Sequence, residues 1–363
     1  MKNIERLLQS LCPEGVVYKA IDELAKTLSP QVKIKSHDYL DCGQYPVIDQ
    51  GQDFIGGYTN DNRVFPKGEY IIFGDHTCVV KYIDFEFAQG ADGVKVLIPK
   101  GQICCKYLYY CMCSIKMDTS YARHWSKMRA EKIPLPPLAV QQEIVRILDS
   151  FTELTAELTA ELTARKKQYE YYRDELFRTA KDASVHYLNE ISDNCDNQRR
   201  PVTSGNRIAG KYPYYGASGI VDYVDDYIFD GDYLLISEDG ANLLARSTPI
   251  AFSIAGKNWV NNHAHVLHFD TYDTRRYVEI YLNSIDLSPY ITGGAQPKLN
   301  QKNLNKIPIP LPSPDEQHRI VSILDRFDAL CNDLTSGLPA EIEARRKQYE
   351  YYRDKLLSFS EKR

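Results

Sequence analysis

Residues 205–212, GNRIAGKY, could form a phosphate-binding loop, because they have the G-x-x-x-x-G-K spacing of one. Tyr212, however, stands where Ser or Thr would hold Mg²⁺, and a polar run precedes the motif instead of an apolar strand. The sequence also lacks N-P-P-Y, D-P-P-Y and F-x-G-x-G, the motifs of amino-methyltransferases. We therefore expect neither ATP hydrolysis nor methyl transfer on this chain.

Two further stretches contain residue types that bind metals. In NNHAHVLH, His263 and His265 would share one face of a strand, but no acid or Cys stands at ligand spacing around them and His268. In ICCKYLYYCMCSI, the cysteines alternate with Tyr and Leu and lack a C-x-x-C pair, which favours a buried helix; they are Cys104, Cys105, Cys111 and Cys113. We expect no metal site. The odd total of nine cysteines also argues against a disulfide framework.

Charge is distributed unevenly along the chain, although the net charge is only −5. Residues 197–211 contain four basic residues and no acid, 296–306 contain three and no acid, and 123–132 contain four against one. Residues 222–239 contain seven acids and neither Lys nor Arg. Such patches are typical of a protein with one face towards a polyanion, although ordinary solvated loops would also explain them.

The elements that would position these residues occur twice. RKKQYEYYRDEL (165–176) returns as RRKQYEYYRDKL (345–356) with ten of twelve residues identical, and residues 133–151 return as 309–327. In each half a proline-rich turn leads into a long helix. The chain is therefore two halves of about 175–180 residues.

Both long helices show the alternating four- and three-residue spacing of a coiled coil, and we expect them to pair antiparallel. The predicted seams are Ile144, Leu148, Phe151, Thr155, Leu158, Leu162, Arg165, Tyr169, Tyr172 and Leu176, and Ile320, Leu324, Phe327, Cys331, Leu334, Leu338, Ile342, Arg345, Tyr349, Tyr352 and Leu356. Arg165 follows Asp149 by sixteen residues, whereas Arg345 follows Asp325 by twenty. The four extra residues fall near Gly337 and Pro339, which should kink or restart the second helix.

The first helix contains a tandem T-A-E-L unit in TELTAELTAELTA, residues 152–164. Each unit advances a helix by about 6 Å and nearly preserves the buried face, because four residues are close to one turn. Residues 139–178 would span about 60 Å. The repeat thus indicates an extendable spacer; a merely solvated helix would explain its polar faces but not its repetition.

Between the helices lie two globular segments, about 15–130 and 184–305. They match weakly: 45–58 with 212–224, 67–75 with 230–239, and VKVLIPK with HVLHFD. Short alternating strands and Gly/Asp turns predict a mixed α+β module in each. The N-terminal IERLLQSLCPEGVVY also matches the end of the central helix, so joining the two termini would give a pseudo-two-fold object.

On these motifs the chain resembles the specificity (S) subunit of type I restriction–modification systems along nearly its whole length. The motifs are the two KQYEYYRD-L blocks, QQEIVRILD and HRIVSILD, GGAQPKLNQKNLNKIPIPLP (293–312), LTSGLPAEIEARRKQYEYYRDKLL and the T-A-E-L repeat. The resemblance implies an α+β fold with two β-rich target-recognition modules, separated by two long antiparallel coiled-coil helices in a circular repeat. The expected parts are a first target-recognition domain (1–132), a central spacer helix (133–181), a second target-recognition domain (182–306) and a C-terminal helix (307–363).

The resemblance also implies function. Each module would recognise one half of a split, asymmetric site in double-stranded DNA, and the helices would set the gap and dock two methyltransferase subunits. Two restriction/translocase subunits would join where the system includes them. The chain itself would be non-catalytic and bind no cofactor, with S-adenosylmethionine, ATP and Mg²⁺ on the partner subunits. We expect a cytoplasmic chain, since the N-terminus resembles no secretory signal and no apolar run could span a membrane.

Candidate contact residues combine position with chemistry. Gln296 and Lys298 lie in a Gly-rich, acid-free loop, where Lys can neutralise a phosphate and Gln can contact an adenine edge, although the loop could simply cap the module. The other DNA-binding candidates are His76, Gln89, Arg123 and Lys127 in the first module and Asn242, Arg246, Asn261 and His263 in the second. In the first module YARHWSKMRAEKIPLP replaces the GGAQPKLNQKNLNKIP form, and Trp125 could equally belong to the core.

The tyrosine blocks could bind partner subunits. Tyr at positions i, i+2 and i+3 cannot all share one helix face, so some must point outward. The candidates are Tyr171, Arg173, Tyr351 and Arg353; helix–helix packing is the alternative. A coiled-coil scaffold with two modules for protein ligands also stays open, whereas the missing motifs weigh against a self-sufficient nuclease or methyltransferase.

Overall fold

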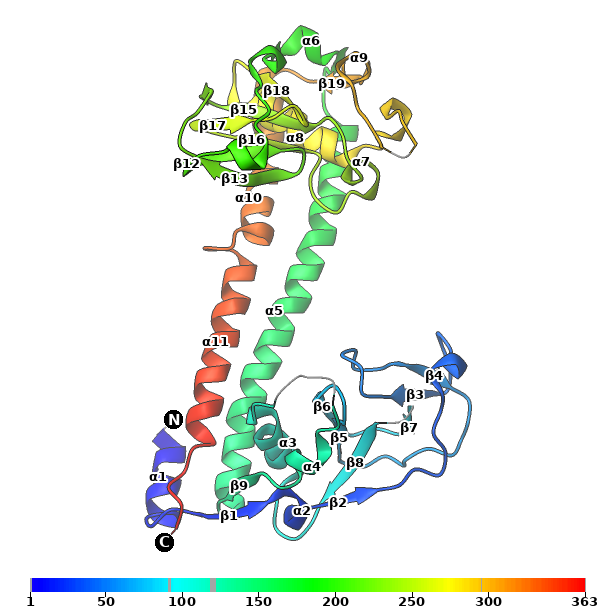
Figure 1. Cartoon of the computed structure of the whole chain (residues 1–363), viewed down its shortest axis with the longest axis vertical. Coiled ribbons are helices and arrows are strands. Elements are labelled where there is room, and N and C mark those ends of the chain that lie inside the picture. The colour runs from blue at the N-terminus through cyan, green and yellow to red at the C-terminus, as the bar shows by residue number, and fades with distance from the viewer. Residues whose placement is uncertain (1, 91–92, 118–121, 295, 363) are drawn as a thin grey trace. The chain divides into compact units, whose positions relative to one another are not determined.

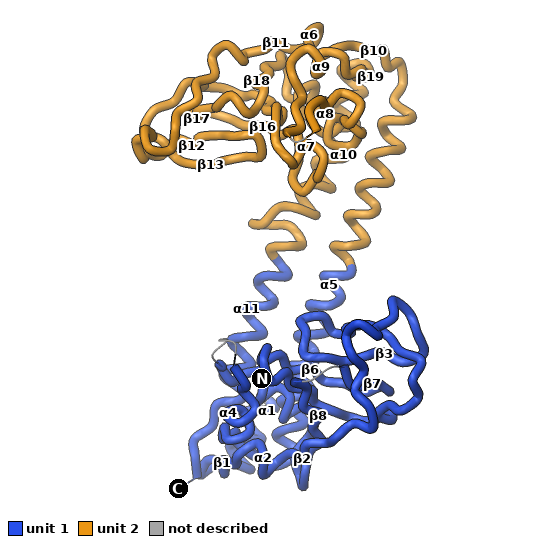
Figure 2. The backbone as a smooth tube through the Cα atoms, turned by 45° about the vertical axis from the view of Figure 1, so that its right-hand side comes forward, with its two compact units in different colours: residues 1–160, 341–363 blue, residues 161–340 orange. Residues whose placement is uncertain are grey.

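The computed structural model describes residues 2–90, 93–117, 122–294 and 296–362. The chain forms two compact units, residues 1–160 with 341–363 and residues 161–340 (Figure 2). The long helix α5 (Leu138–Arg178) is divided between the units, so the expected four-part division stays a prediction. No helix in the described part of the chain is both long enough and apolar enough to cross a membrane.

The first module is built on an antiparallel sheet in the order β2-β8-β5-β6, with a smaller sheet β4-β3-β7 in which β3 and β7 run parallel (Figure 1). Its elements are β1 (Val17–Ala20), α2 (Ile21–Leu24), β2 (Ala25–Leu28), β3 (Tyr45–Ile48), β4 (Gly57–Thr59), β5 (Tyr70–Gly74), β6 (Val80–Ile83), β7 (Ala88–Gln89), β8 (Val94–Pro99), α3 (Cys105–Ser114), α4 (Trp125–Met128) and β9 (Lys132–Leu135). β1 pairs with β9, and α1 (Lys2–Leu11) precedes the module.

The second module has the same plan. Its sheet order is β11-β18-β15-β16, and its smaller sheet is β13-β12-β17-β14 with β12 and β17 parallel. Its elements are β10 (Ser184–His186), α6 (Leu188–Ile191), β11 (Asp193–Asn194), β12 (Ala209–Gly216), β13 (Gly219–Val224), β14 (Phe229–Asp230), β15 (Tyr233–Ser237), α7 (Asn242–Ala245), β16 (Ala251–Ile254), β17 (Lys257–Val260), β18 (Ala264–His268), α8 (Tyr272–Ser284), α9 (Gln301–Leu304) and β19 (Ile309–Leu311). Short 3₁₀ turns lie at Ser36–Asp38, Asp196–Gln198, Ser204–Asn206 and Ser288–Tyr290. The three weak sequence matches between the modules are confirmed: they are β3–β4 with β12–β13, β5 with β15, and β8 with β18.

Alternation along the central strands explains the layers. In β5, Ile71 and Phe73 enter one core with Tyr107 and Leu108 of α3, whereas Ile72 enters another with residues of the smaller sheet. A strand that is covered on both faces has a continuous apolar sequence, as YIIFG in β5 and YLLIS in β15 show. The prediction that ICCKYLYYCMCSI forms a buried helix is confirmed by α3, whose Cys105 and Cys111 are buried.

Each module is attached to the helix that follows it by the same contacts. In unit 1, Tyr107 donates to Pro134 O (3.0 Å), Gln141 to Pro136 O (2.8 Å) and Lys106 to Asp149 (2.8 Å). In unit 2 the same contacts are Tyr277 to Pro310 O (2.7 Å), Gln317 to Pro312 O (2.7 Å) and Arg276 to Asp325 (2.7 Å). The three contacts thus occur once in each unit, at equivalent positions of the two sequence repeats, so the proline-rich turns are matched attachment points.

The second long helix is interrupted, as Gly337 and Pro339 predicted. α10 (Pro314–Asn332) ends before residue 333, and α11 (Leu338–Leu356) starts after residue 337. A Cβ on Gly337 would lie 2.6 Å from Ala329 O, too close for a side chain to fit. We call residues 333–337 the helix break.

Aromatic contacts join the helices within each unit. In unit 1, Phe151 of α5 stacks on Tyr352 of α11 with 5.4 Å between ring centroids. In unit 2, Tyr172 of α5 lies 5.8 Å from Phe327 of α10, and Leu176 packs against a cluster containing Ile320, so numbering rises along α5 as it falls along α10. Every side chain from 152 to 164 is exposed or half-buried. The T-A-E-L stretch therefore contributes little to any core.

The segments near the two termini are hydrogen-bonded to each other. Val16 N donates to Ser360 O (2.9 Å), and Lys362 N donates to Val16 O (2.9 Å). Gly15 has φ +90°, and a Cβ there would lie 2.3 Å from Ser360 O, so only Gly fits this close approach. The circular arrangement expected from the sequence is confirmed in unit 1.

Candidate nucleic-acid interface

In both modules the candidate loops follow the central strand of the sheet and precede its neighbour. Glu238 N, just after β15, donates to His263 O (2.9 Å), just before β18. Asp75 N, just after β5, donates to Gly93 O (2.6 Å), just before β8. The third loop joins through Leu299 N to Glu238 O (2.8 Å) in one module and His124 N to Asp75 O (2.8 Å) in the other. One backbone frame therefore holds three loops together in each module.

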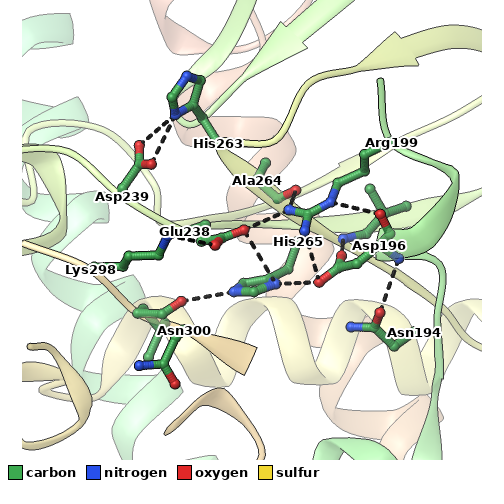
Figure 3. Close-up of polar contacts among 12 residues, drawn as sticks. Asn194, Asp196, Arg199, Glu238, Asp239, His263, Ala264, His265, Lys298 and Asn300 are labelled. Atoms are coloured by element: carbon green, nitrogen blue, oxygen red, sulfur yellow. Dashed lines mark hydrogen bonds and ion pairs between the residues drawn. The ribbon is translucent and has the colours of Figure 1, made fainter. Parts of the chain in front are cut away.

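A buried polar network fixes this frame in the second module (Figure 3). Arg199 donates to Glu238 (2.7 Å) and to Ala264 O (2.7 Å), and it lies 3.3 Å from Asp196. His265, only 1% exposed, places Nδ1 2.6 Å from Asp196 and Nε2 2.8 Å from Leu299 O. The network therefore links the segment 196–199, the strands β15 and β18, and the loop before α9.

Electrostatics in the network favour ionised carboxylates. Burial acts to raise the pKa of Asp196, but the hydrogen bond with His265, the backbone N–H of Val266 and the charge of Arg199 outweigh it and hold that pKa below its usual value. Burial likewise acts to raise the pKa of Glu238, and Arg199, His265 and Lys298 together lower it. The network is thus an array of partnered charges, which holds its geometry at neutral pH.

His263 and Lys298 lie at the outer edge of the network. His263 Nδ1 is 2.9 Å from Asp239, and Lys298 Nζ is 3.1 Å from Glu238, while its side chain is 51% exposed. Thr292 and Lys298 exchange backbone hydrogen bonds across the Gly-rich loop, and Gly293 has φ +85° at its turn. Gln296 is exposed on the same loop. The structure therefore brings His263, Gln296 and Lys298 to neighbouring loops of one frame.

The other three candidates of the second module have local structural partners. Asn261 is buried and accepts from His263 N (2.8 Å). Asn242 binds the turn at Thr248 through both atoms of its amide, and the chain at Arg246 is left-handed (φ +52°). Arg246 donates to Ile285 O (2.6 Å), and its burial lowers its pKa. These three side chains form hydrogen bonds with nearby backbone groups. Arg246 and Arg173 also line a cavity of about 430 Å³ in unit 2.

In the first module the candidates gather around Asp75. His76 Nδ1 lies 3.1 Å from Ala122 O, next to Arg123, and Arg123 and Lys127 are exposed. Trp125 N donates to Asp75 (2.8 Å), and its ring packs against Phe73 of the core. The remaining candidate is apart from these, since Gln89 is 3% exposed and its Nε2 donates to Val94 O (3.4 Å).

The sequence did not reveal that the hairpins of the smaller sheets belong to the same surface. Thr77 Oγ1 donates to Gln50 O (2.6 Å), and His76 N donates to Gln50 Oε1 (3.2 Å). In the second module the Ser237 hydroxyl donates to Ala217 O at the tip of β12–β13. The sequence match between 45–58 and 212–224 marked these hairpins as equivalent but not their position. The network of Asp196, Arg199, Glu238 and His265 was also missed.

The tyrosine blocks have the same geometry in each unit. Tyr171 and Tyr351 are each 63% exposed, as the spacing argument required of some members. Arg173 lies over Tyr169 and bonds Asp174, and Arg353 lies over Tyr349 and bonds Asp354. One exposed tyrosine beside one partnered arginine is therefore presented twice.

Among residues 2–90, 93–117, 122–294 and 296–362, no three or more His, Cys, Asp and Glu side chains gather where they could hold an ion. Burial raises the pKa of the Cys105 thiol to about 12, which favours the neutral, packed form. No disulfide joins the described cysteines.

Comparisons with known proteins agree with this architecture. The model of the family described as "Type I restriction modification DNA specificity domain" matches residues 13–165 and 181–344. The EcoR124I/EcoR124II specificity subunit of Escherichia coli is 35% identical over 400 residues, which cover 99% of this chain and 97% of that protein. A putative type I specificity subunit of Haemophilus influenzae is 41% identical over 178 residues, 48% of this chain and 46% of its own length.

Solved structures show the same fold. The type I restriction–modification S subunit from M. genitalium aligns with a TM-score of 0.64 at 17% identity, covering 94% of this chain and 96% of that one. A chain from a study of complex assembly and conformational transition of the type I R-M system aligns with a TM-score of 0.58 at 16% identity, covering 96% and 98%. The chain therefore belongs to the family of type I restriction–modification specificity subunits, non-catalytic proteins that recognise DNA sequence.

Proposed function

We propose that the chain recognises a bipartite, asymmetric site in double-stranded DNA, one half per module, and delivers it to two methyltransferase subunits. One observation carries the proposal: two modules whose larger sheets have equivalent strand orders are attached by equivalent contacts to two helical connections. The modules differ in the residues of their candidate loops, so two copies of one scaffold present two different surfaces. Different surfaces would select different half-sites, which accounts for asymmetry.

Recognition in the second module depends on the loop frame around Glu238. Lys298 would neutralise a backbone phosphate, and Gln296 and His263 would contact base edges in the major groove. Arg199 and His265 act indirectly, because they hold the loops in place beneath the contact residues. In the first module His76, Arg123 and Lys127 would take the corresponding positions around Asp75.

The helical connections would set the unrecognised gap between the two half-sites. α5 is one continuous helix of 41 residues and carries the T-A-E-L units in a stretch without buried side chains. One unit corresponds to about 6 Å, against about 3.4 Å per base pair. Changing the number of units would therefore change the gap by one or two base pairs without altering either half-site.

Methyltransferase docking would use the repeated surface around Tyr171 with Arg173 and Tyr351 with Arg353. Exposed aromatic side chains beside arginine are typical of protein interfaces, and two equivalent copies match two partner subunits. Two restriction/translocase subunits would bind through the same complex where the system contains them. S-adenosylmethionine, ATP and Mg²⁺ would be bound by these partners. Because its substrate is DNA, the complex would act in the cytoplasm.

The test is a module exchange. Residues 182–306 are replaced by the corresponding module of a relative, the chimera is co-expressed with the cognate methyltransferase in an unmethylated host, and modified bases are mapped by long-read sequencing. We expect one half of the motif to change while the other half and the gap persist. A motif that changes in both halves, or stays whole, would overturn the assignment of one half-site to each module.

A further inference from the structure

The two helical connections differ in residue count between equivalent aromatic contacts. Along α5, Tyr172 follows Phe151 by 21 residues. Along α10 and α11, Tyr352 follows Phe327 by 25 residues. Since Phe151 contacts Tyr352 and Tyr172 contacts Phe327, both connections run between the same two contacts. The second connection therefore contains four more residues than the first between the same two aromatic contacts.

The four additional residues of the second connection lie at the helix break. Asp333 N still bonds Ala329 O (3.2 Å), and Gly337 N bonds Asp333 O (3.0 Å), so residues 333–337 close a turn of their own. The Asp333 carboxylate accepts from Thr335 N (2.7 Å) and from the hydroxyls of Thr335 and Ser336. Leu334, which the heptad spacing placed in the coiled-coil seam, is instead 80% exposed. These bonds run between neighbours, so opening the turn would leave the cores of both units intact.

We propose that the helix break is a second determinant of the DNA gap: it stores chain length that the second connection releases when α5 gains a T-A-E-L unit. This inference rests on the proposed function of α5 as the spacer. With one added unit, Tyr172 would follow Phe151 by 25 residues, the count that α10 and α11 already have. Without the surplus, the longer α5 would have to strain one of the two aromatic contacts. The number of residues in the helix break thus limits the DNA gap lengths to which the protein can bind.

Pro339 affects how the second connection could lengthen at the helix break. A proline in a helix interior lacks the N–H for the helical bond and kinks the helix, so α10 and α11 do not merge readily. Residues 333–337 instead open towards extended chain, which advances about 3.3 Å per residue against 1.5 Å in a helix. For a shorter α5 the break would hold a longer loop, which costs little chain entropy.

The experiment compares chains with and without the surplus. One unit is inserted after Leu162 in the native chain and in a chain lacking residues 334–337 with Pro339→Ala, where both connections count 21 residues. Each chain is co-expressed with the methyltransferase, and the motif is mapped. We expect the native and shortened chains to methylate one motif with the same gap. The insertion should lengthen the gap in the native chain and reduce methylation at least ten-fold in the shortened one. Equal methylation at the longer gap in both backgrounds would overturn the inference.

A second measurement covers variants that fail to fold or assemble. In the isolated full chain, hydrogen exchange of the Thr335 and Gly337 amides is compared before and after insertion of one unit. We expect exchange to accelerate at least ten-fold when the turn is pulled open, and unchanged exchange would contradict the inference. The proposed function fails separately, if the native chain directs no two-part motif.

Discussion

Lys106 of α3 holds its ammonium 2.8 Å from the carboxylate of Asp149 on α5, and so ties the first module to its helix. Tyr110 donates to the same carboxylate at 2.6 Å. The second module repeats the arrangement, with Arg276 and Tyr272 donating to Asp325 at 2.7 Å each. The proposed recognition of two half-sites at one gap would need this rigidity, since a loose attachment would let the distance between the modules vary.

Removing either carboxylate should therefore loosen one joint. Asp325→Ala leaves Arg276 and Tyr272 without this acceptor, and we expect it to lower the free energy of unfolding by about 1–3 kcal/mol. Asp149→Ala should cost a similar amount, about 1–3 kcal/mol: Lys106 is more exposed than Arg276, but the hydroxyl of the buried Tyr110 loses this acceptor. Urea unfolding of the full chain measures both. The matched control is Arg319→Ala, which removes an exposed i,i+3 pair and should change stability by less than about 0.5 kcal/mol.

The buried network should stabilise the second module and have no effect on the stability of the first. Glu238→Gln removes one charge from between Arg199 and Lys298, and we expect a loss of about 1–3 kcal/mol, because the mostly buried Arg199 loses part of its compensation. Hydrogen exchange should rise in residues 193–310 and stay unchanged in residues 17–135. Asp239→Asn, at the exposed pair with His263, should leave exchange unchanged. Equal loosening by both substitutions would contradict a structural role specific to Glu238.

Acid should destabilise the second module through the same carboxylates. The folded pKa values of Asp196 and Glu238 lie below their usual values, so the stability they contribute is fully present above about pH 5. It is lost as the pH falls through the lowered folded values. Melting temperatures between pH 7 and pH 3 should fall less in an Asp196→Asn, Glu238→Gln double variant than in the native chain. Parallel curves for the two chains would exclude this contribution.

Two loop residues should affect DNA binding in distinguishable ways. Lys298→Ala should weaken binding to all sequences alike and reduce the slope of log affinity against log salt by about 1. Gln296→Ala should relax selection at one base pair of one half-site, by about 1–3 kcal/mol of discrimination. Both are measured on the assembled methyltransferase complex with DNA variants. Lys67→Ala, an exposed lysine of the first module outside the candidate loops, should change neither quantity.

Deleting Thr159–Leu162 should shorten the gap by one or two base pairs and leave both half-sites unchanged. The four side chains are exposed or half-buried, so the deletion removes little core and stability should hold. Methylome mapping gives the gap directly. A variant that methylates the native motif at its native spacing would show that α5 does not set the gap.

The sequence predicted the frame of the molecule well because the frame repeats. Ten identical residues around Tyr169 and Tyr349 revealed the two halves, and Gly337 with Pro339 marked the end of one helix and the start of another. Weak matches paired β5 with β15 through their apolar runs. In each case the signal was either a repeat of one segment elsewhere in the sequence or the turn chemistry of Gly and Pro, and neither required knowledge of long-range contacts.

The site was predicted only in part, because its geometry depends on long-range contacts. Asp196 and His265 are 69 residues apart in sequence, and no local pattern indicates their 2.6 Å contact. Gln89 was a DNA-contact candidate from its sequence position, but it is buried at the end of β7. Lys298 was correctly placed on a loop. His263 was expected on a strand with His265, but it lies in the turn just before β18. The pairing of Lys298 with Glu238 and of His263 with Asp239 required the fold.

The central claim is that two modules on one chain recognise two half-sites at a fixed gap. The most direct measurement is a methylome of an unmethylated host that expresses this chain with its cognate methyltransferase, mapped by long-read sequencing. We predict a single two-part, asymmetric motif with one gap length, absent when this chain is omitted. A continuous motif, or the same methylation without this chain, would contradict the account.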